Sequence, residues 1–246
     1  MNLVVDIGNS RVKLAVMESG RCVAERVAER FSAAVLGELT AAFPVRRAIV
    51  SSTRGDAADV AAAVRAQGIP CLEFTSQTPV PIASDYLTPH TLGRDRLAAA
   101  VGVTVLWPGR DVLVVDCGTA VTIDLVTADG TFRGGSISPG LRMRFRALHE
   151  FTAALPLCDV PDSDGLFGRS TSGAIGAGVL NSLVFEIEGY IGRLRRQIDG
   201  LCVIFTGGDA KYLTKRIKNA IFADRNPVFC GLDRILEFNA SEEDLP

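Results

Sequence analysis

One short phrase occurs twice in this sequence: an apolar run that ends in Asp-x-Gly. The first copy is Val4 to Gly8 (VVDIG) and the second is Val114 to Gly118 (VVDCG). A few residues after each copy, a second apolar stretch begins. Each copy therefore predicts a β-hairpin whose tip carries a carboxylate, a glycine and a hydroxyl or amide group. Glycine permits positive φ and close approach to the backbone, which a bound phosphate requires.

Two such hairpins suggest two similar half-domains with a nucleotide site between them. Asp6 and Asp116 suit a hydrated divalent or monovalent cation, and Lys13 follows the first tip at a spacing that suits a polyphosphate. A single tip would be better explained as an ordinary Asx or Gly turn, with Asp6 bonded to backbone N–H groups. The repetition favours the phosphate interpretation.

Composition narrows the class of protein. A chain of 246 residues that is 48% apolar can bury a large core. A net charge of −2 without a basic run gives no reason to expect nucleic acid. None of the six cysteines forms a CxxC pair, which argues against zinc and favours reduced thiols in the cytoplasm. We also expect no signal peptide and no apolar stretch long enough to span a membrane.

Periodicity predicts alternating strands and helices in two lobes, residues 1–107 and 108–246. A helix is expected over about 94–106, and a long one over about 173–198. Another should begin after Gly140, with a stripe that continues past residue 150. That stripe comprises Leu141, Phe145, Leu148, Thr152 and Leu155. Its arginines, Arg142, Arg144 and Arg146, are expected to face solvent.

A third candidate motif is Thr206-Gly-Gly-Asp209, between a predicted strand and a predicted helix. Such a junction allows a ring or a phosphate to pack on the backbone at a helix N-terminus. Taken alone, it is explained equally well as a tight turn with Asp209 near the helix start. Together with the two hairpins, Gly207 and Gly208 resemble the adenosine motif of the actin, hexokinase and Hsp70 superfamily.

The segment Tyr86 to Arg96 (YLTPHTLGRDR) enters a predicted helix. Asp95 has an arginine on each side, which favours its ionised form. A carboxylate there can accept a hydroxyl proton, and Arg96 can bind a carboxylate through two hydrogen bonds. The alternative is that Asp95 only caps the helix while both arginines are solvated. The segment alone does not separate these readings.

Several motifs in order resemble the type III pantothenate kinases, also called the Bvg accessory factor family. They are Gly93-Arg-Asp-Arg96 after Tyr86 and Pro89, Asp116-Cys-Gly-Thr-Ala-Val-Thr-Ile-Asp124, Gly134-Gly-Ser-Ile-Ser-Pro-Gly140, Thr152-Ala-Ala-Leu-Pro156, and Ser170-Thr171. The resemblance covers nearly the whole chain, from Asp6 to Gly208. Ser10 stands where many members have Thr, a change that keeps the hydroxyl group.

This resemblance implies an α/β protein of two actin-like, ribonuclease H-like lobes. It further implies that pantothenate is phosphorylated with ATP, the first step of coenzyme A synthesis, in a homodimer. Asp95 would be the catalytic base, and Asp116 would bind a monovalent cation, potassium or ammonium, beside Mg²⁺. ATP would contact Asp6, Ile7, Gly8, Asn9, Ser10, Arg11, Val12, Lys13, Thr119, Gly207 and Gly208. Pantothenate would contact Tyr86, Gly93, Arg94, Asp95, Arg96 and Thr171, with Thr171 reaching the partner's substrate.

Three other functions remain open at this point. One is a kinase of the same superfamily for another small alcohol, against which the Tyr86–Arg96 segment argues. Another is a non-catalytic nucleotide-binding regulator, which loss of Asp95 or of the glycines would have supported. The third is an interaction scaffold built on the long helix, which leaves both hairpins unexplained.

Overall fold

The computed structural model describes residues 1–161, 165–218 and 221–240. The chain forms two compact units. The first contains residues 1–110, 126–134 and 224–246, and the second contains residues 111–125 and 135–223. The expected boundary at 107–108 lies close to the change of unit at 110–111. Two later segments, 126–134 and 224–246, group with the first unit.

A five-stranded sheet in the order β3-β2-β1-β4-β5 forms the centre of the first unit. Its strands are β1 (Asn2–Ile7), β2 (Val12–Glu18), β3 (Arg21–Ala28), β4 (Arg47–Ser52) and β5 (Cys71–Glu73). β1 to β3 are antiparallel neighbours, whereas β4 and β5 run parallel to β1. The first predicted hairpin is therefore present, with Asp6 paired to Lys13 across its two strands.

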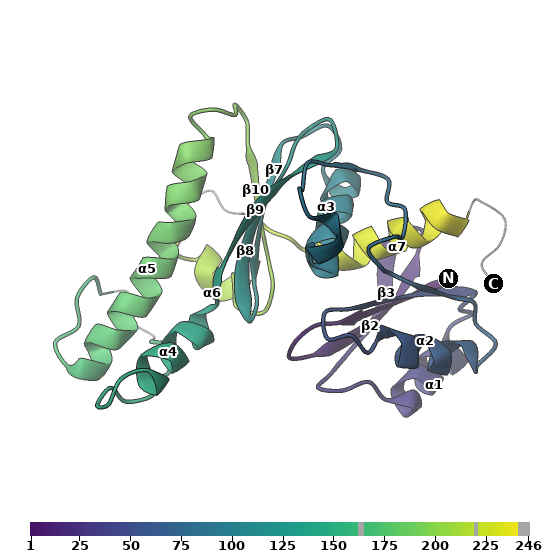
Figure 1. The fold of residues 1–246 in the computed structure, drawn as a ribbon, viewed down its shortest axis with the longest axis horizontal. Helices are drawn as coiled ribbons and strands as arrows, with labels where there is room; N and C mark the ends of the chain where they lie inside the picture. The colour runs from purple at the N-terminus through teal and green to yellow at the C-terminus, as the bar shows by residue number, and fades with distance from the viewer. Residues whose placement is uncertain (162–164, 219–220, 241–246) are drawn as a thin grey trace. The chain divides into compact units, whose positions relative to one another are not determined.

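Both faces of this sheet are covered by helices (Figure 1). The side chains of Leu3, Val5 and Ile7 pack with α1 (Ala33–Ala42) and α2 (Ala57–Arg65) in one apolar cluster. Successive side chains of a strand point to opposite faces, so Asp6 faces the other side. There α3 (Arg94–Leu106) and α7 (Pro227–Ala240) pack on the sheet and on each other.

The second sheet has the order β11-β10-β7-β8-β9-β6. Its strands are β6 (Ala83–Ser84), β7 (Val112–Cys117), β8 (Ala120–Val126), β9 (Thr131–Pro139), β10 (Cys202–Thr206) and β11 (Ile221–Phe222). β10 runs parallel to both β7 and β11. The second predicted hairpin is β7–β8. The sequence also predicts a last strand and helix near residues 226–237, but the strand lies earlier, as β11.

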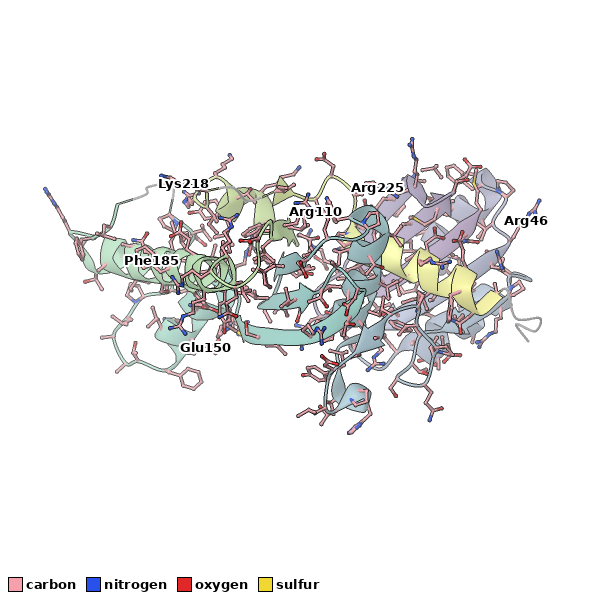
Figure 2. All side chains as sticks on the ribbon, turned by 90° about the horizontal axis from the view of Figure 1, so that it is seen from above. Arg46, Arg110, Glu150, Phe185, Lys218 and Arg225 are labelled. Atoms are coloured by element: carbon pink, nitrogen blue, oxygen red, sulfur yellow. The ribbon has the colours of Figure 1, made fainter. Side chains whose placement is uncertain are left out.

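Helix α5 (Thr171–Leu194) covers this second sheet together with α4 (Leu141–Glu150) and the short α6 (Ala210–Thr214). Leu183 and Ile187 of α5 are fully buried in its core, while Phe185, labelled in Figure 2, is 55% exposed. Among the described helices, α5 alone is long and apolar enough to cross a membrane by length and composition. The expectation that no stretch reaches that length was too strong. Burial of one face of α5 explains its composition equally well.

Helix α4 corrects two predictions. It ends at Glu150, so Thr152 and Leu155 do not continue its stripe. Instead, Thr152 Oγ1 donates to the carbonyl of Leu148 and accepts from the backbone N–H of Leu155. Arg144 does not face solvent: it pairs with Glu186 of α5 and donates to the carbonyl of Pro139. The sequence further predicts that residues 241–244 are frayed, and these residues lie outside the described part of the chain.

Candidate active site

The first hairpin tip buries an acid and exposes its turn. Asp6 is only 6% exposed at the end of β1, and burial raises its pKa to about 6. Lys13 opposes this rise, and the charge of Asp95 adds to it. The structure thus brings Asp6, Lys13 and Asp95, three residues that the sequence singled out, into one electrostatic environment.

The tip itself is closed by a hydrogen bond from the backbone N–H of Gly8 to the carbonyl of Arg11, 3.0 Å long. Asn9, Ser10 and Arg11 are exposed at the tip. Ile7 and Val12, by contrast, are fully buried in this structure. Positive φ is not the reason for the glycine, since neither Gly8 nor Gly118 adopts it.

In the second unit, the second tip lies against the Gly-Gly junction. β10 pairs with β7 so that Thr206 is opposite Asp116. A Cβ on Gly207, which has φ +92°, would overlap Asp116 Oδ1 and lie 2.6 Å from the backbone of Cys117. The N–H of Asp209 also donates to the carbonyl of Cys117. Only glycine at position 207 allows this close packing of two predicted nucleotide motifs.

Gly140, which precedes α4, packs against the second hairpin tip. The N–H of Gly140 donates to the carbonyl of Thr119 at 3.0 Å, and a Cβ on Gly140 would overlap that oxygen. Burial raises the pKa of Asp209, and the charge of Arg142 counteracts the rise. Arg142 was not predicted as a site residue, because helical spacing cannot show which charge the first turn of α4 faces.

The first three residues of α3 are Arg94, Asp95 and Arg96. Their side chains point in different directions, because each helical residue is rotated by about 100° from the one before it. Asp95 Oδ1 accepts from the backbone N–H of Arg96 at 2.8 Å, and its charge acts on Asp6. The Arg94 guanidinium lies over the ring of Phe74, 5.8 Å from its centroid. Gly93 precedes them as the helix N-cap.

Arg96 lies over two neighbouring aromatic rings. Its guanidinium carbon lies 5.6 Å from the ring centroid of Tyr86 and 5.8 Å from that of Phe132. The two rings are themselves 6.0 Å apart. Pairing of β6 with β9, Ser84 opposite Phe132, brings the rings together. Phe132 is fully buried and was not predicted, since no motif marks it.

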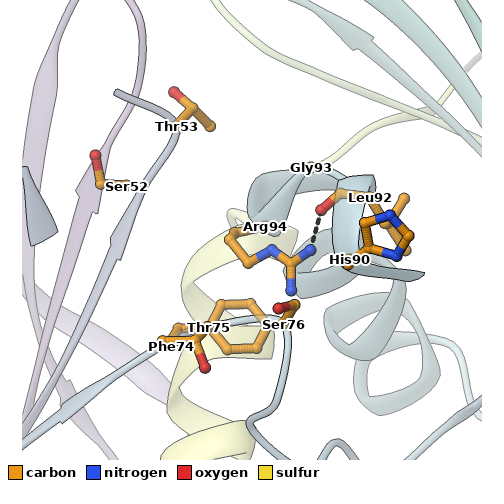
Figure 3. Close-up of a pocket in the computed structure, with 9 residues that line it drawn as sticks. All are labelled: Ser52, Thr53, Phe74, Thr75, Ser76, His90, Leu92, Gly93 and Arg94. Carbon is orange, nitrogen blue, oxygen red and sulfur yellow. Dashed lines mark hydrogen bonds between the residues drawn. The ribbon is translucent and has the colours of Figure 1, made fainter. Parts of the chain in front are cut away.

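A pocket of about 330 Å³ opens beside the start of α3 (Figure 3). It is lined by Ser52 and Thr53 after β4, by Phe74, Thr75 and Ser76 after β5, and by His90, Leu92, Gly93 and Arg94. Of the predicted substrate residues, only Gly93 and Arg94 line it. Thr171, at the start of α5, is exposed and belongs to the second unit. The described residues contain no cluster of three or more His, Cys, Asp or Glu able to hold a metal.

The fold is shared with proteins of known structure. A Baf-family protein of Campylobacter jejuni, described as a transcriptional activator, is 20% identical and superimposes with a TM-score of 0.66 over 97% of this chain and 99% of that one. The activator of 2-hydroxyisocaproyl-CoA dehydratase from Clostridium difficile, solved with bound ADPNP, is 12% identical with a TM-score of 0.54, over 98% and 97%. The two-lobe, actin-like α/β architecture expected from the sequence is thereby confirmed.

Sequence comparison identifies the family. The type III pantothenate kinase of Phocaeicola vulgatus is 43% identical over 239 residues, which cover 97% of this chain and 99% of the relative. The type III pantothenate kinase profile matches residues 2–193, a range that includes both hairpins and the Gly93–Arg96 motif. The chain belongs to the type III pantothenate kinase family.

Proposed function

We infer that this protein transfers the γ-phosphoryl group of ATP to the terminal hydroxyl of pantothenate, the first step of coenzyme A synthesis. Membership of the type III pantothenate kinase family supports both the reaction and the substrate. The observation that supports it in this chain is the position of Asp95, in the first turn of α3 and within electrostatic reach of Asp6. A carboxylate at that point can serve a hydroxyl acceptor next to a phosphate-binding tip.

Asp95 is proposed as the catalytic base. Its Oδ1 is held by the N–H of Arg96, which fixes the carboxylate and leaves Oδ2 to accept the hydroxyl proton. The deprotonated oxygen then attacks the γ-phosphorus in line with the leaving ADP oxygen. A positioned base of this kind contributes about 10²- to 10⁴-fold to the rate.

The two hairpins are proposed to hold the triphosphate. The backbone of the exposed residues 9–11 and the Lys13 ammonium would supply positive charge at the first tip, and the Thr119 hydroxyl would supply a donor at the second. Gly207 and Gly208, beside that tip, would accommodate the adenosine, because glycine leaves their backbone uncovered.

Asp6 and Asp116 fit cations by their chemistry, since hard cations prefer carboxylate oxygens. The raised pKa of Asp6 shows a buried acid whose charge the protein compensates only in part, so a cation would find there a charge to neutralise. We propose Mg²⁺ with the phosphates at Asp6 and potassium or ammonium at Asp116. When bound, these ions stabilise negative charge on the transferring phosphoryl group.

Pantothenate is proposed to contact Tyr86, Gly93, Arg96 and the backbone of Arg94 at the start of α3. Arg96 is 6% exposed and flanked by two rings, so it offers a fixed guanidinium for the substrate carboxylate. Thr171 would add a hydroxyl from the partner in a homodimer. The second unit exposes several large apolar side chains that a partner could cover, including those of Phe151, Phe167 and Phe185. The six cysteines are free thiols, as expected for the cytoplasmic location that we propose.

The direct test measures ADP release with pantothenate, in buffers containing potassium or sodium only. We expect turnover that needs pantothenate and rises with potassium. In Asp95→Asn, kcat should fall at least about 100-fold while ATP still binds. Nucleotide binding by the wild type without any pantothenate-dependent turnover would instead support the regulator. Release with other small alcohols but not with pantothenate would point to a different kinase.

A further inference from the structure

We propose that the pocket on the Arg94 side of α3 binds a small oxyanion, with Arg94, Ser76 and His90 as its donors. This site is distinct from the proposed pantothenate pocket at Arg96 and Tyr86. Oxyanion here means the chemistry that a phosphate group and a carboxylate share.

The first support is the direction of the two arginines. Arg94 and Arg96 are two residues apart, so a helix places them about 200° apart around its axis. Arg96 lies over the rings of Tyr86 and Phe132, whereas Arg94 lies over Phe74. Phe74 follows β5 and is nearly fully buried. The two guanidinium groups therefore face different surroundings.

The second support is that Arg94 is partly buried and that the structure uses only some of its hydrogen-bond donors. Its guanidinium donates through Nη2 to the carbonyls of Pro89 and Leu92. Nε and Nη1 have no hydrogen-bonding partner within the described part of the chain. Burial lowers the pKa of Arg94, and Asp95 opposes that effect. None of the residues that line the pocket is acidic, so an anion would neutralise a charge that the protein leaves partly desolvated.

The third support comes from the remaining lining groups. The hydroxyls of Ser52 and Thr53 are used within the protein, since they donate to Asp56 and to the carbonyl of Ile7. By contrast, no hydrogen bond joins Ser76 Oγ or the His90 ring to any other described residue. Both line the same pocket as Arg94 (Figure 3). A volume of about 330 Å³ is at the small end of the range for ligand pockets.

The chain has two histidines, so the NMR signals of one can report binding at the pocket while those of the other serve as a control. His90 lies in the pocket, and His149 lies in the second unit, where its Nδ1 is 2.9 Å from the carbonyl of Leu155. With ¹⁵N-labelled histidine, we would titrate the full chain with inorganic phosphate at fixed pH and ionic strength. The His90 resonances should shift to saturation, and those of His149 should stay in place.

Variants then test the donors. Arg94→Gln should weaken phosphate binding at least about tenfold, and Ser76→Ala should weaken it severalfold. Arg54→Gln removes the same charge from a residue that pairs with Asp56 and does not line the pocket, so affinity should change less than about twofold. Ser76 is exposed, so its variant should fold even where Arg94→Gln does not.

Acetate separates the two sources of the oxyanion. Saturable shifts with phosphate alone indicate a phosphate group, and shifts with both anions indicate a general oxyanion site. Equal shifts at His90 and His149, or the same affinity in Ser76→Ala and Arg94→Gln as in wild type, would overturn the proposal. The NMR shifts do not depend on turnover. A negative result would therefore overturn the oxyanion site without contradicting the proposed kinase activity.

Discussion

Asp6 at the end of β1 and Asp95 in the first turn of α3 are close enough for their negative charges to repel each other. Burial is the main cause of the raised pKa of Asp6, and Asp95 adds to it while Lys13 opposes both. The charge of the proposed base therefore adds to the raised pKa of the proposed cation ligand. Binding of a cation at Asp6 would favour the charged form of that acid.

Asp6→Asn should stabilise the ligand-free protein at neutral pH. Because the pKa of Asp6 is raised from 3.8 to about 6, its ionisation costs about 3 kcal/mol of folding free energy. The cost is absent below about pH 4, grows as the pH rises and is complete above about pH 6. Urea unfolding from pH 3.5 to 8 should show this gain in the variant only at higher pH. Asp59→Asn, an exposed control in α2, should change little, and an equal gain at every pH would contradict the assignment.

Asp116→Ala should reduce activation by potassium more than it reduces stability. The carboxylate lies where β7 ends beside Gly207, and removal of a cation ligand should shift the potassium titration to higher concentration. Potassium-dependent turnover and thermal unfolding are measured on the same sample. A lower melting temperature together with an unchanged potassium response would mean that Asp116 is only structural.

Phe132→Leu should raise the KM for pantothenate severalfold and leave the affinity for ATP nearly unchanged. The buried ring lies beside both Arg96 and Tyr86, and contacts of this kind are worth about 0.5–1.5 kcal/mol. Loss of activity through kcat alone, or parallel losses for both substrates, would show that Phe132 does not act through these two residues.

Thr171→Val should likewise raise the KM for pantothenate and spare that for ATP, because a lost hydrogen bond costs about 1 kcal/mol or somewhat more. A second test is complementation. Asp95→Asn and Thr171→Trp, each inactive, should regain activity when mixed and reassembled, since one hybrid site contains both native residues. A fully active monomer in sedimentation would rule out a shared site.

Gly231→Ala should destabilise the protein by about 2–3 kcal/mol or more. A Cβ there would overlap the carbonyl of Ala98 and lie 2.9 Å from the N–H of Gly102, at the contact between α7 and α3. Gly37→Ala is the matched control in the same unit. Nothing lies within 4 Å of its Cβ, so helix propensity should make it neutral or stabilising by up to about 1 kcal/mol. Equal effects of the two changes would contradict this packing.

The parts of the fold that local sequence determines were predictable. Both hairpins follow from repeated apolar runs that flank a short polar tip, and α3 follows from its apolar spacing and its start at Gly93. The end of α4 was not predictable in this way, since Leu148, Thr152 and Leu155 continue the helical spacing of the stripe beyond Glu150. The hydroxyl of Thr152 bonds the backbone after the helix has stopped.

The same distinction applies to the residues of the candidate site: some are marked by local sequence and others are not. Asp6, Asp95 and Gly207 lie in motifs that mark them as candidates, whereas no motif marks Phe132 or Phe74. Phe132 reaches Tyr86 only because β6 pairs with β9, and Phe74 reaches Arg94 only because β5 ends near the start of α3. Such contacts depend on strand order, which a single sequence does not carry.

The packing of α3 against α7 also has a consequence for synthesis on the ribosome. α3 is complete at residue 106, but its partner spans residues 227–240. At typical elongation rates, on the order of ten seconds separate the two. During that time the small-residue face at Ala98 and Gly102 has no cover, and the helix that carries Asp95 is not yet fixed. The nascent first unit therefore stays incomplete until nearly the whole chain has emerged.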